Sequence, residues 1–131
     1  MFKIGLLLIT ILASTWAMPI EKDPFFIQTM AKAENKQKLI LMIYTTDDCP
    51  ECAYMKKKVF IDPLVKPFLT QHFIIIEKNI HKDPLPDGFE YFGIPTMFFI
   101  DSTGAKKETL IGSKRPKPFL DELHRIWKKK Q

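Results

Sequence analysis

Two cysteines separated by two residues are the part of this sequence best suited to do chemistry. They form Cys49-Pro50-Glu51-Cys52 and are the only cysteines among the 131 residues. A thiolate is the nucleophile in disulfide exchange, and the free N–H groups and dipole of a helix N-terminus stabilise it. An apolar run of strand length precedes the pair, and Pro50 suits the first position of a helix. We therefore expect Cys49 to be the exposed attacking sulfur and Cys52 the shielded resolving sulfur.

Two other uses of the cysteine pair stay open. A permanent structural disulfide would close a very small loop and would constrain the unfolded chain little. The pair could also hold a soft metal such as Cu(I), as in a metallochaperone or binding module, with His81 as the one candidate for a further ligand. No histidine stands at zinc-finger spacing from Cys52. We rank redox chemistry without cofactor or metal first, and metal binding last.

The elements that must position the cysteines alternate between helix and strand. Unbroken apolar runs predict buried strands, and Asp23-Pro24 predicts a capped helix start. The apolar side of this first helix is expected to consist of Phe25, Phe26, Ile27, Met30, Ala31 and Ala33. The expected order is helix 24–36, strand 38–44, helix 50–60, helical segment 62–71, strand 73–79, loop 81–88, turn or short helix 89–92, strands 96–101 and 106–111, and helix 116–129. A strand–helix–strand unit followed by a hairpin predicts an α/β fold with a mixed four-stranded sheet and helices on both faces.

A second signature, Gly93-Ile94-Pro95-Thr96, stands just before an expected strand. Together with the cysteine pair, it makes the chain from about Lys38 to Trp127 resemble the thioredoxin superfamily. The segment 59–65, Val-Phe-Ile-Asp-Pro-Leu-Val, is similar to the C-terminal domain of DsbD-type disulfide reductases. The resemblance implies a thioredoxin-like fold in which Pro95 is cis and lies beside the Cys49 sulfur. It also implies that the backbone of Ile94 pairs with a bound substrate strand, on a surface shared with Pro50 and Glu51.

The chain departs from the family where acids assist proton transfer. Ile43 stands where thioredoxin has a buried Asp, and Lys56 stands where the DsbD-type domain has a second acid. Glu77 is expected opposite Ile43 on the neighbouring strand, so a partly buried Glu77 is a candidate proton acceptor for Cys52. We rank this hypothesis below a solvated Glu77 paired with Lys56 or Lys78, because charged residues are seldom fully buried.

Acidic residues also surround the nucleophile in sequence. Asp47, Asp48 and Glu51 would each raise the pKa of Cys49, because a nearby negative charge disfavours a thiolate. Strong oxidants of this fold have a very low nucleophile pKa, since a stable thiolate stabilises the reduced form. The acids therefore favour a reductant or general exchanger over a strong oxidant.

The first segment of the chain has the pattern of a targeting signal. Lys3 precedes an uncharged apolar run from Ile4 to Ala17, and the sequence then turns polar. This pattern predicts a signal peptide over residues 1–17, cleaved after Ala17, and a thioredoxin-like domain over residues 18–131. An uncleaved anchor is the alternative, although the run is short for a membrane span. Export would place the protein in the periplasm or outside the cell, where the cysteines meet oxidising conditions.

Composition narrows the remaining choices of function and partner. Hydrophobic residues make up 46% and charged residues 27%, which is ordinary for a globular domain and excludes a multi-pass membrane protein. The formal charge is +5, but there is no basic stripe with interleaved aromatic residues, so nucleic-acid binding is not expected. The expected partners are proteins bearing a disulfide or a dithiol, with a membrane reductase as electron donor. We expect a monomer.

Overall fold

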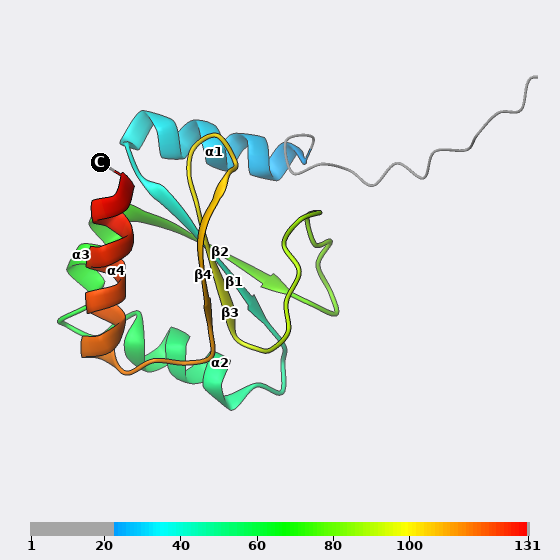
Figure 1. The fold of residues 1–131 in the computed structure, drawn as a ribbon. Coiled ribbons are helices and arrows are strands. Elements are labelled where there is room, and N and C mark those ends of the chain that lie inside the picture. The colour runs from blue at the N-terminus through cyan, green and yellow to red at the C-terminus, as the bar shows by residue number, and fades with distance from the viewer. Residues whose placement is uncertain (1–22, 131) are drawn as a thin grey trace, which may run out of the picture.

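A four-stranded mixed sheet forms the centre of the fold in the computed structural model, which describes residues 23–130 (Figure 1). Its strands are β1 (Leu39–Thr45), β2 (Phe73–Asn79), β3 (Thr96–Ile100) and β4 (Lys106–Ile111). They lie in the order β2-β1-β3-β4, with β1 and β2 parallel and the other neighbouring pairs antiparallel. The α/β class and the mixed sheet are therefore as the sequence predicts. The expected signal peptide, residues 1–17, lies outside the described residues.

Helices cover both faces of this sheet. They are α1 (Pro24–Lys36), α2 (Pro50–Tyr54), α3 (Lys66–His72) and α4 (Pro116–Lys130), and α2 continues as a π-helical turn, η2 (Met55–Val59). Helix α1 begins where predicted, because the Asp23 carboxylate accepts hydrogen bonds from the backbone N–H groups of Phe25 and Phe26. Figure 1 shows α1 on one face of the sheet, with α3 and α4 on the other.

The core consists of two apolar clusters, one on each face of the sheet. Alternate residues of β1 divide between them, so that all seven residues of this central strand are buried. The first cluster joins the sheet to α2, η2, α3 and α4, and the second joins it to α1 and the segment 80–94. Both clusters hold β1 in place, and the site-bearing loop follows directly from its last residue.

Four expectations about individual elements are wrong in detail. Strand β2 is not buried along its length: it lies at the edge of the sheet, and Ile75 is 42% exposed. On α1, Phe25 and Ile27 face outward with exposures of 53% and 46%, because only the positions near Phe26 and Ala33 meet the sheet. Residues 62–65 form turns before α3 rather than part of a helix, and residues 89–92 contain no helix.

No helix within residues 23–130 combines the length and the apolar character that a membrane crossing requires.

Candidate redox site

The two cysteines lie at the start of helix α2, just after the short loop that follows strand β1. Cys49 is the N-cap of α2, and its sulfur accepts a hydrogen bond from the backbone N–H of Cys52 at 3.1 Å. Pro50 occupies the first helical turn, where its missing N–H costs no hydrogen bond. The two sulfurs are joined in a disulfide whose Cα atoms are 5.2 Å apart. The local sequence thus places one sulfur at the positive end of the helix and the other inside its first turn.

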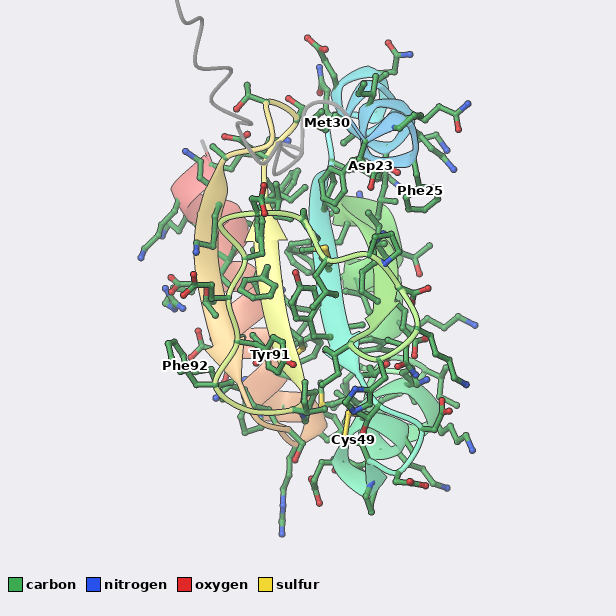
Figure 2. The ribbon with its side chains drawn as sticks, turned by 90° about the vertical axis from the view of Figure 1, so that its right-hand side faces the viewer. Asp23, Phe25, Met30, Cys49, Tyr91 and Phe92 are labelled. Carbon is green, nitrogen blue, oxygen red and sulfur yellow. A yellow bond between two sulfur atoms is a disulfide. The ribbon has the colours of Figure 1, made fainter. Side chains whose placement is uncertain are left out.

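The two sulfur-bearing residues differ in their access to solvent. Cys49 is partly exposed, whereas Cys52 is fully buried at 0% exposure. Figure 2 places Cys49 at the end of the molecule away from Asp23 and helix α1. A partner approaching this end would therefore reach the Cys49 sulfur first.

The segment before β3 lies against the turn that follows β4. The Ile94–Pro95 peptide bond is cis, and the Pro95 carbonyl accepts a hydrogen bond from the Gly112 N–H at 2.8 Å. Thr96 closes the preceding turn, because its hydroxyl donates to the carbonyl of Gly93 at 2.5 Å. Ile94 packs partly buried against the second core cluster. The backbone around Pro95 is therefore held from both sides.

An apolar side chain projects from this same segment. Phe92, two residues before Ile94, is 89% exposed, while its neighbour Tyr91 packs edge-on against the buried ring of Tyr44 with centroids 5.7 Å apart. Figure 2 shows Tyr91 and Phe92 in the same half of the molecule as Cys49. Phe92 is thus an apolar surface group on the segment that leads into Ile94 and Pro95.

The acids near Cys49 do not all keep a free charge. Asp47 forms an ion pair with Lys82 at 2.5 Å and accepts a hydrogen bond from the Asn79 side chain at 2.9 Å. The hydrogen bond from Lys82, and then its charge, hold the pKa of Asp47 below its usual range. Glu51 accepts a hydrogen bond from the Ser113 hydroxyl. The negative field at Cys49 is therefore weaker than the three acids in sequence suggest.

Glu77 lies opposite Ile43 in the sheet, as expected, but it is not buried. Its carboxylate accepts hydrogen bonds from the Thr45 hydroxyl at 2.8 Å and from the Lys56 ammonium at 2.7 Å, and its side chain is 42% exposed. Glu77 is therefore not the partly buried carboxylate that the lower-ranked hypothesis of a proton acceptor requires. The structure instead has the solvated ion pair, because β2 is an edge strand and Lys56 reaches its end from the helix.

The lowest-ranked hypothesis is a metal site formed by the cysteine pair with His81 as a further ligand. His81 lies in the turn after β2, where its backbone N–H donates to the Asn79 side chain at 3.0 Å. Within residues 23–130, no three or more His, Cys, Asp or Glu side chains gather as a metal site.

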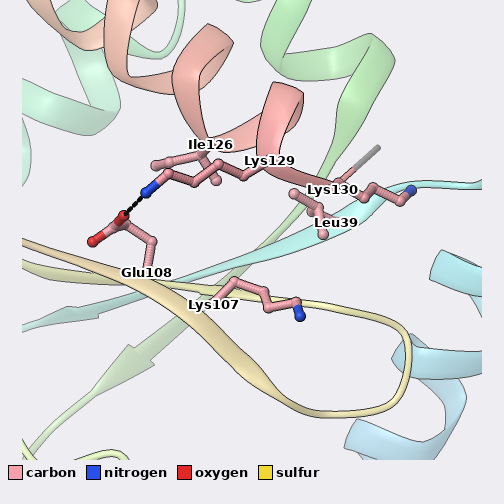
Figure 3. Close-up of a pocket in the computed structure, with 6 residues that line it drawn as sticks. All are labelled: Leu39, Lys107, Glu108, Ile126, Lys129 and Lys130. Atoms are coloured by element: carbon pink, nitrogen blue, oxygen red, sulfur yellow. Dashed lines mark ion pairs between the residues drawn. The ribbon is translucent and has the colours of Figure 1, made fainter.

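A surface pocket lies at the other end of strand β1. Leu39, the first residue of β1, lines it together with Lys107, Glu108, Ile126, Lys129 and Lys130 (Figure 3). Lys129 and Glu108 form an ion pair across it at 3.6 Å. The cysteines follow the last residue of β1, so this pocket is separate from the redox site.

Sequence reasoning missed two polar partners of the site, Lys82 and Ser113. Their contacts with Asp47 and Glu51 join residues that are 35 or more positions apart in the chain, so no local pattern indicates them. These partners depend on the packing of loops, which residue spacing does not encode.

Comparison with known proteins identifies the family. A family model described as a thioredoxin-like domain matches residues 26–127. Anterior gradient protein 2 of Xenopus laevis is 25% identical over 100 residues, which are 74% of this chain and 52% of that protein. The chain therefore spans about half the length of the curated relatives it matches.

Solved structures share the fold. A thioredoxin from Thermus thermophilus is 25% identical, with a TM-score of 0.61 over 76% of this chain and 81% of that one. The oxidised C-terminal domain of DsbD from Neisseria meningitidis is 21% identical, with a TM-score of 0.58 over 76% and 90%. The periplasmic thioredoxin SoxS of Paracoccus pantotrophus is 16% identical, with a TM-score of 0.56 over 72% and 100%. With its cysteine pair at the start of α2 and the family match across almost all described residues, the chain belongs to the thioredoxin-like domain family.

Proposed function

We propose that this protein is an exported thiol–disulfide oxidoreductase. The observation that carries the proposal is the pairing of a partly exposed Cys49 at the start of a helix with a fully buried Cys52 one turn further in. An accessible sulfur at a helix N-terminus favours attack on a partner, and a shielded neighbour favours intramolecular resolution. No cofactor is required.

The reaction proceeds by two exchanges of sulfur partners. The Cys49 thiolate attacks a substrate disulfide, forms a mixed disulfide and releases the first substrate thiolate. Cys52 then loses its proton to water, and its thiolate attacks the Cys49 sulfur and releases the second substrate thiolate. Two electrons pass from the cysteine pair to the substrate, and the Cys49–Cys52 disulfide remains.

The protein acts as a reductant or exchanger rather than as a strong oxidant. Asp48 and Glu51 keep negative charge near Cys49, although Lys82 balances Asp47. A less stable thiolate makes the reduced pair a better electron donor. A membrane reductase would restore the reduced pair, and the structural likeness to a DsbD C-terminal domain and to a periplasmic thioredoxin supports this setting.

The substrates are proteins that carry a disulfide or a dithiol. Pro50, Glu51, Ile94 and Pro95 form the surface that receives the substrate segment, with the Ile94 backbone as its hydrogen-bonding partner. Export depends on a signal peptide over residues 1–17, and the monomeric domain comprises residues 18–131. The mass of the mature protein recovered from an exporting host would show whether cleavage follows Ala17.

Paired cysteine variants test the activity and the two roles. The wild-type protein is expected to reduce insulin with dithiothreitol as donor, and Cys49→Ser to abolish this activity. Cys52→Ser is expected to accumulate mixed disulfides, because the resolving thiol is missing. Trapping by Cys49→Ser instead would reverse the two roles, and an inactive wild type would refute the oxidoreductase.

Two further measurements test the direction of electron transfer and the choice between an oxidoreductase and a metal carrier. The reduction potential of the Cys49–Cys52 pair, from equilibration with glutathione, is expected to be closer to that of thioredoxin than to that of DsbA. Metal analysis of the reduced protein addresses the metallochaperone. Stoichiometric copper without insulin reduction would replace the proposed function by metal transfer.

A further inference from the structure

Lys56 lies on the active-site helix one turn beyond the buried cysteine. It follows Cys52 by four residues, and residues at this spacing are neighbours on one side of a helix. Its ammonium is 2.7 Å from the Glu77 carboxylate, which also accepts a hydrogen bond from Thr45 at 2.8 Å. Thr45 ends β1, so this cluster joins the strand before the cysteines to the helix after them. Lys56 is thereby tied to the end of β2 by this ion pair, with 37% of its side chain exposed.

A positive charge at this position would change the chemistry of Cys52. Burial of Cys52 disfavours its thiolate, yet the proposed resolving step requires that thiolate. Ile43, the β1 residue opposite Glu77, supplies no charge from the sheet. An ammonium neighbour stabilises the thiolate directly, whereas an acid would have to accept its proton.

The other charged groups around the active-site helix are less suited to this task. Asp47 pairs with Lys82 and Glu51 accepts a hydrogen bond from Ser113, and both acids are exposed. The remaining charged groups nearby are Asp48 before the helix, Lys57 and Lys58 on its exposed side, and Lys114 and Arg115 in the turn beyond Ser113. Of the three helix lysines, only Lys56 is partly buried and paired with the sheet.

We propose that Lys56, held by Glu77, is the positioning charge that stabilises the Cys52 thiolate during resolution of the mixed disulfide. This inference rests on the proposed function and adds a residue to it. The Cys52 proton goes to water and Lys56 stays protonated throughout. The Cys52 sulfur bonds to the Cys49 sulfur, the bond from Cys49 to the substrate sulfur breaks, and the substrate leaves as a thiolate. Glu77 holds Lys56 and takes no proton.

The first test measures the Cys52 thiol alone. In a Cys49→Ser protein Cys52 is the single thiol of the chain, so the ultraviolet absorbance of its thiolate gives its titration directly. Adding Lys56→Met is expected to lower the thiolate fraction at neutral pH about threefold to tenfold, as loss of a nearby opposite charge does. Lys57→Met, which removes the same charge from the exposed side of the helix, serves as the matched control and is expected to leave the titration unchanged. Equal titrations for the two lysine variants would overturn the proposal.

A Glu77 variant distinguishes this proposal from one in which the Glu77 carboxylate accepts the Cys52 proton. Glu77→Gln removes the negative charge but keeps a carbonyl oxygen that can accept the hydrogen bond from Lys56. If Lys56 acts by its charge, this variant leaves the Cys52 thiolate fraction at neutral pH unchanged or raises it, because a negative neighbour is removed. If Glu77 accepted the proton, the same change would slow resolution. Slower resolution in Glu77→Gln, together with an unchanged rate in Lys56→Met, would overturn our proposal and identify Glu77 as the acceptor of the Cys52 proton.

The second test follows resolution itself. A mixed disulfide between Cys49 and thionitrobenzoate releases a coloured thiolate when Cys52 attacks. Lys56→Met is expected to slow this release about threefold to tenfold near neutral pH and to match wild type at high pH, where Cys52 is fully ionised. A defect of equal size at all pH values would indicate a structural role and overturn the proposal. Both readouts are independent of insulin reduction, so an inactive wild type would refute the oxidoreductase without deciding the role of Lys56.

Discussion

The hydroxyl of Ser113 donates a hydrogen bond to the carboxylate of Glu51, the residue between Pro50 and Cys52. Ser113 belongs to the turn after β4, so this contact ties the cysteine motif to the far edge of the sheet. The same turn supplies Gly112, whose N–H donates to the Pro95 carbonyl. The cysteine motif and the segment before β3 are thus both anchored to residues 112–113.

Glu51→Gln is expected to make Cys49 more reactive. Removing a negative charge near Cys49 favours its thiolate, so alkylation of Cys49 near pH 7 should rise about twofold to threefold. The measurement is the iodoacetamide rate of reduced Cys52→Ser protein at low ionic strength. Glu34→Gln on α1 removes the same charge at a distance and should have no effect. An unchanged rate in Glu51→Gln would mean that solvent fully screens this carboxylate.

Gly112→Ala and Gly93→Ala form a matched pair of backbone tests. Gly112 has φ of +84°, which an L side chain rarely adopts, so its substitution is expected to lower the free energy of unfolding by about 1–2 kcal/mol. A Cβ at Gly93 would lie 3.5 Å from the Ile111 side chain, an ordinary contact, and should cost less than about 0.5 kcal/mol. Urea unfolding of both variants gives the comparison. Equal losses would contradict the conformational explanation.

Tyr44→Phe is expected to stabilise the protein. Tyr44 is fully buried, and among the described residues its hydroxyl has no hydrogen-bond partner. Burial therefore raises the pKa of this phenol and leaves its polar atom desolvated. Removing the hydroxyl should raise the free energy of unfolding by about 1 kcal/mol, measured by urea unfolding. The partly buried Tyr54 provides the control, and a clear loss of stability in Tyr44→Phe would reveal a bound water or another partner.

The stability of the fold is expected to fall as the solution becomes mildly acidic, partly through His72. This ring packs between Phe68 and Trp127, with centroids 4.3 Å from each. Burial, followed by the charges of His124, Lys130 and Lys38, lowers the pKa of His72 below its ordinary value of 6.5. The unfolded chain therefore binds the proton first, and the contribution of His72 is present above about pH 6.5 and is lost as the pH falls.

Urea unfolding between pH 8 and pH 5 checks the sign of the His72 effect. His72→Phe is expected to lose less stability over this range than the wild-type protein. His81→Phe, in the turn after β2, is the control and should follow wild type. A steeper loss in His72→Phe would mean that the aromatic neighbours favour the charged imidazole.

Phe92→Ser tests the apolar group beside the proposed substrate surface. Phe92 is 89% exposed, so the change should alter the free energy of unfolding by less than about 0.5 kcal/mol. Reduction of insulin is expected to slow, because a polypeptide substrate extends from Cys49 far enough to contact Phe92. Reduction of a small aromatic disulfide should not slow, because such a substrate contacts only the cysteines. Ile61→Ser, an equally polar change at another exposed apolar side chain, is the control. Equal slowing with both substrates would place the effect at the cysteines rather than at substrate contact.

Much of the fold could be predicted from local patterns. The unbroken apolar run before the cysteines predicted β1, because a strand covered on both faces needs no polar side. Asp23 and Pro24 predicted the start of α1, because capping depends only on neighbouring residues. The Cys49-Pro50-Glu51-Cys52 motif likewise placed both sulfurs at the start of a helix, since Pro50 fits the first helical turn and Cys49 can cap it.

Features that depend on which elements become neighbours in space could not be predicted from local patterns. The apolar run of β2 resembles that of β1, yet β2 lies at the sheet edge, since strand order is set by packing. That edge position exposes Glu77 and lets Lys56 reach it. Lys82 and Ser113 meet Asp47 and Glu51 only once their loops are folded. Residue types and their spacing were enough to identify which residues could do chemistry, because reactivity and helix capping are local. The charges around those residues were decided by the fold, because electrostatic fields depend on distance in space.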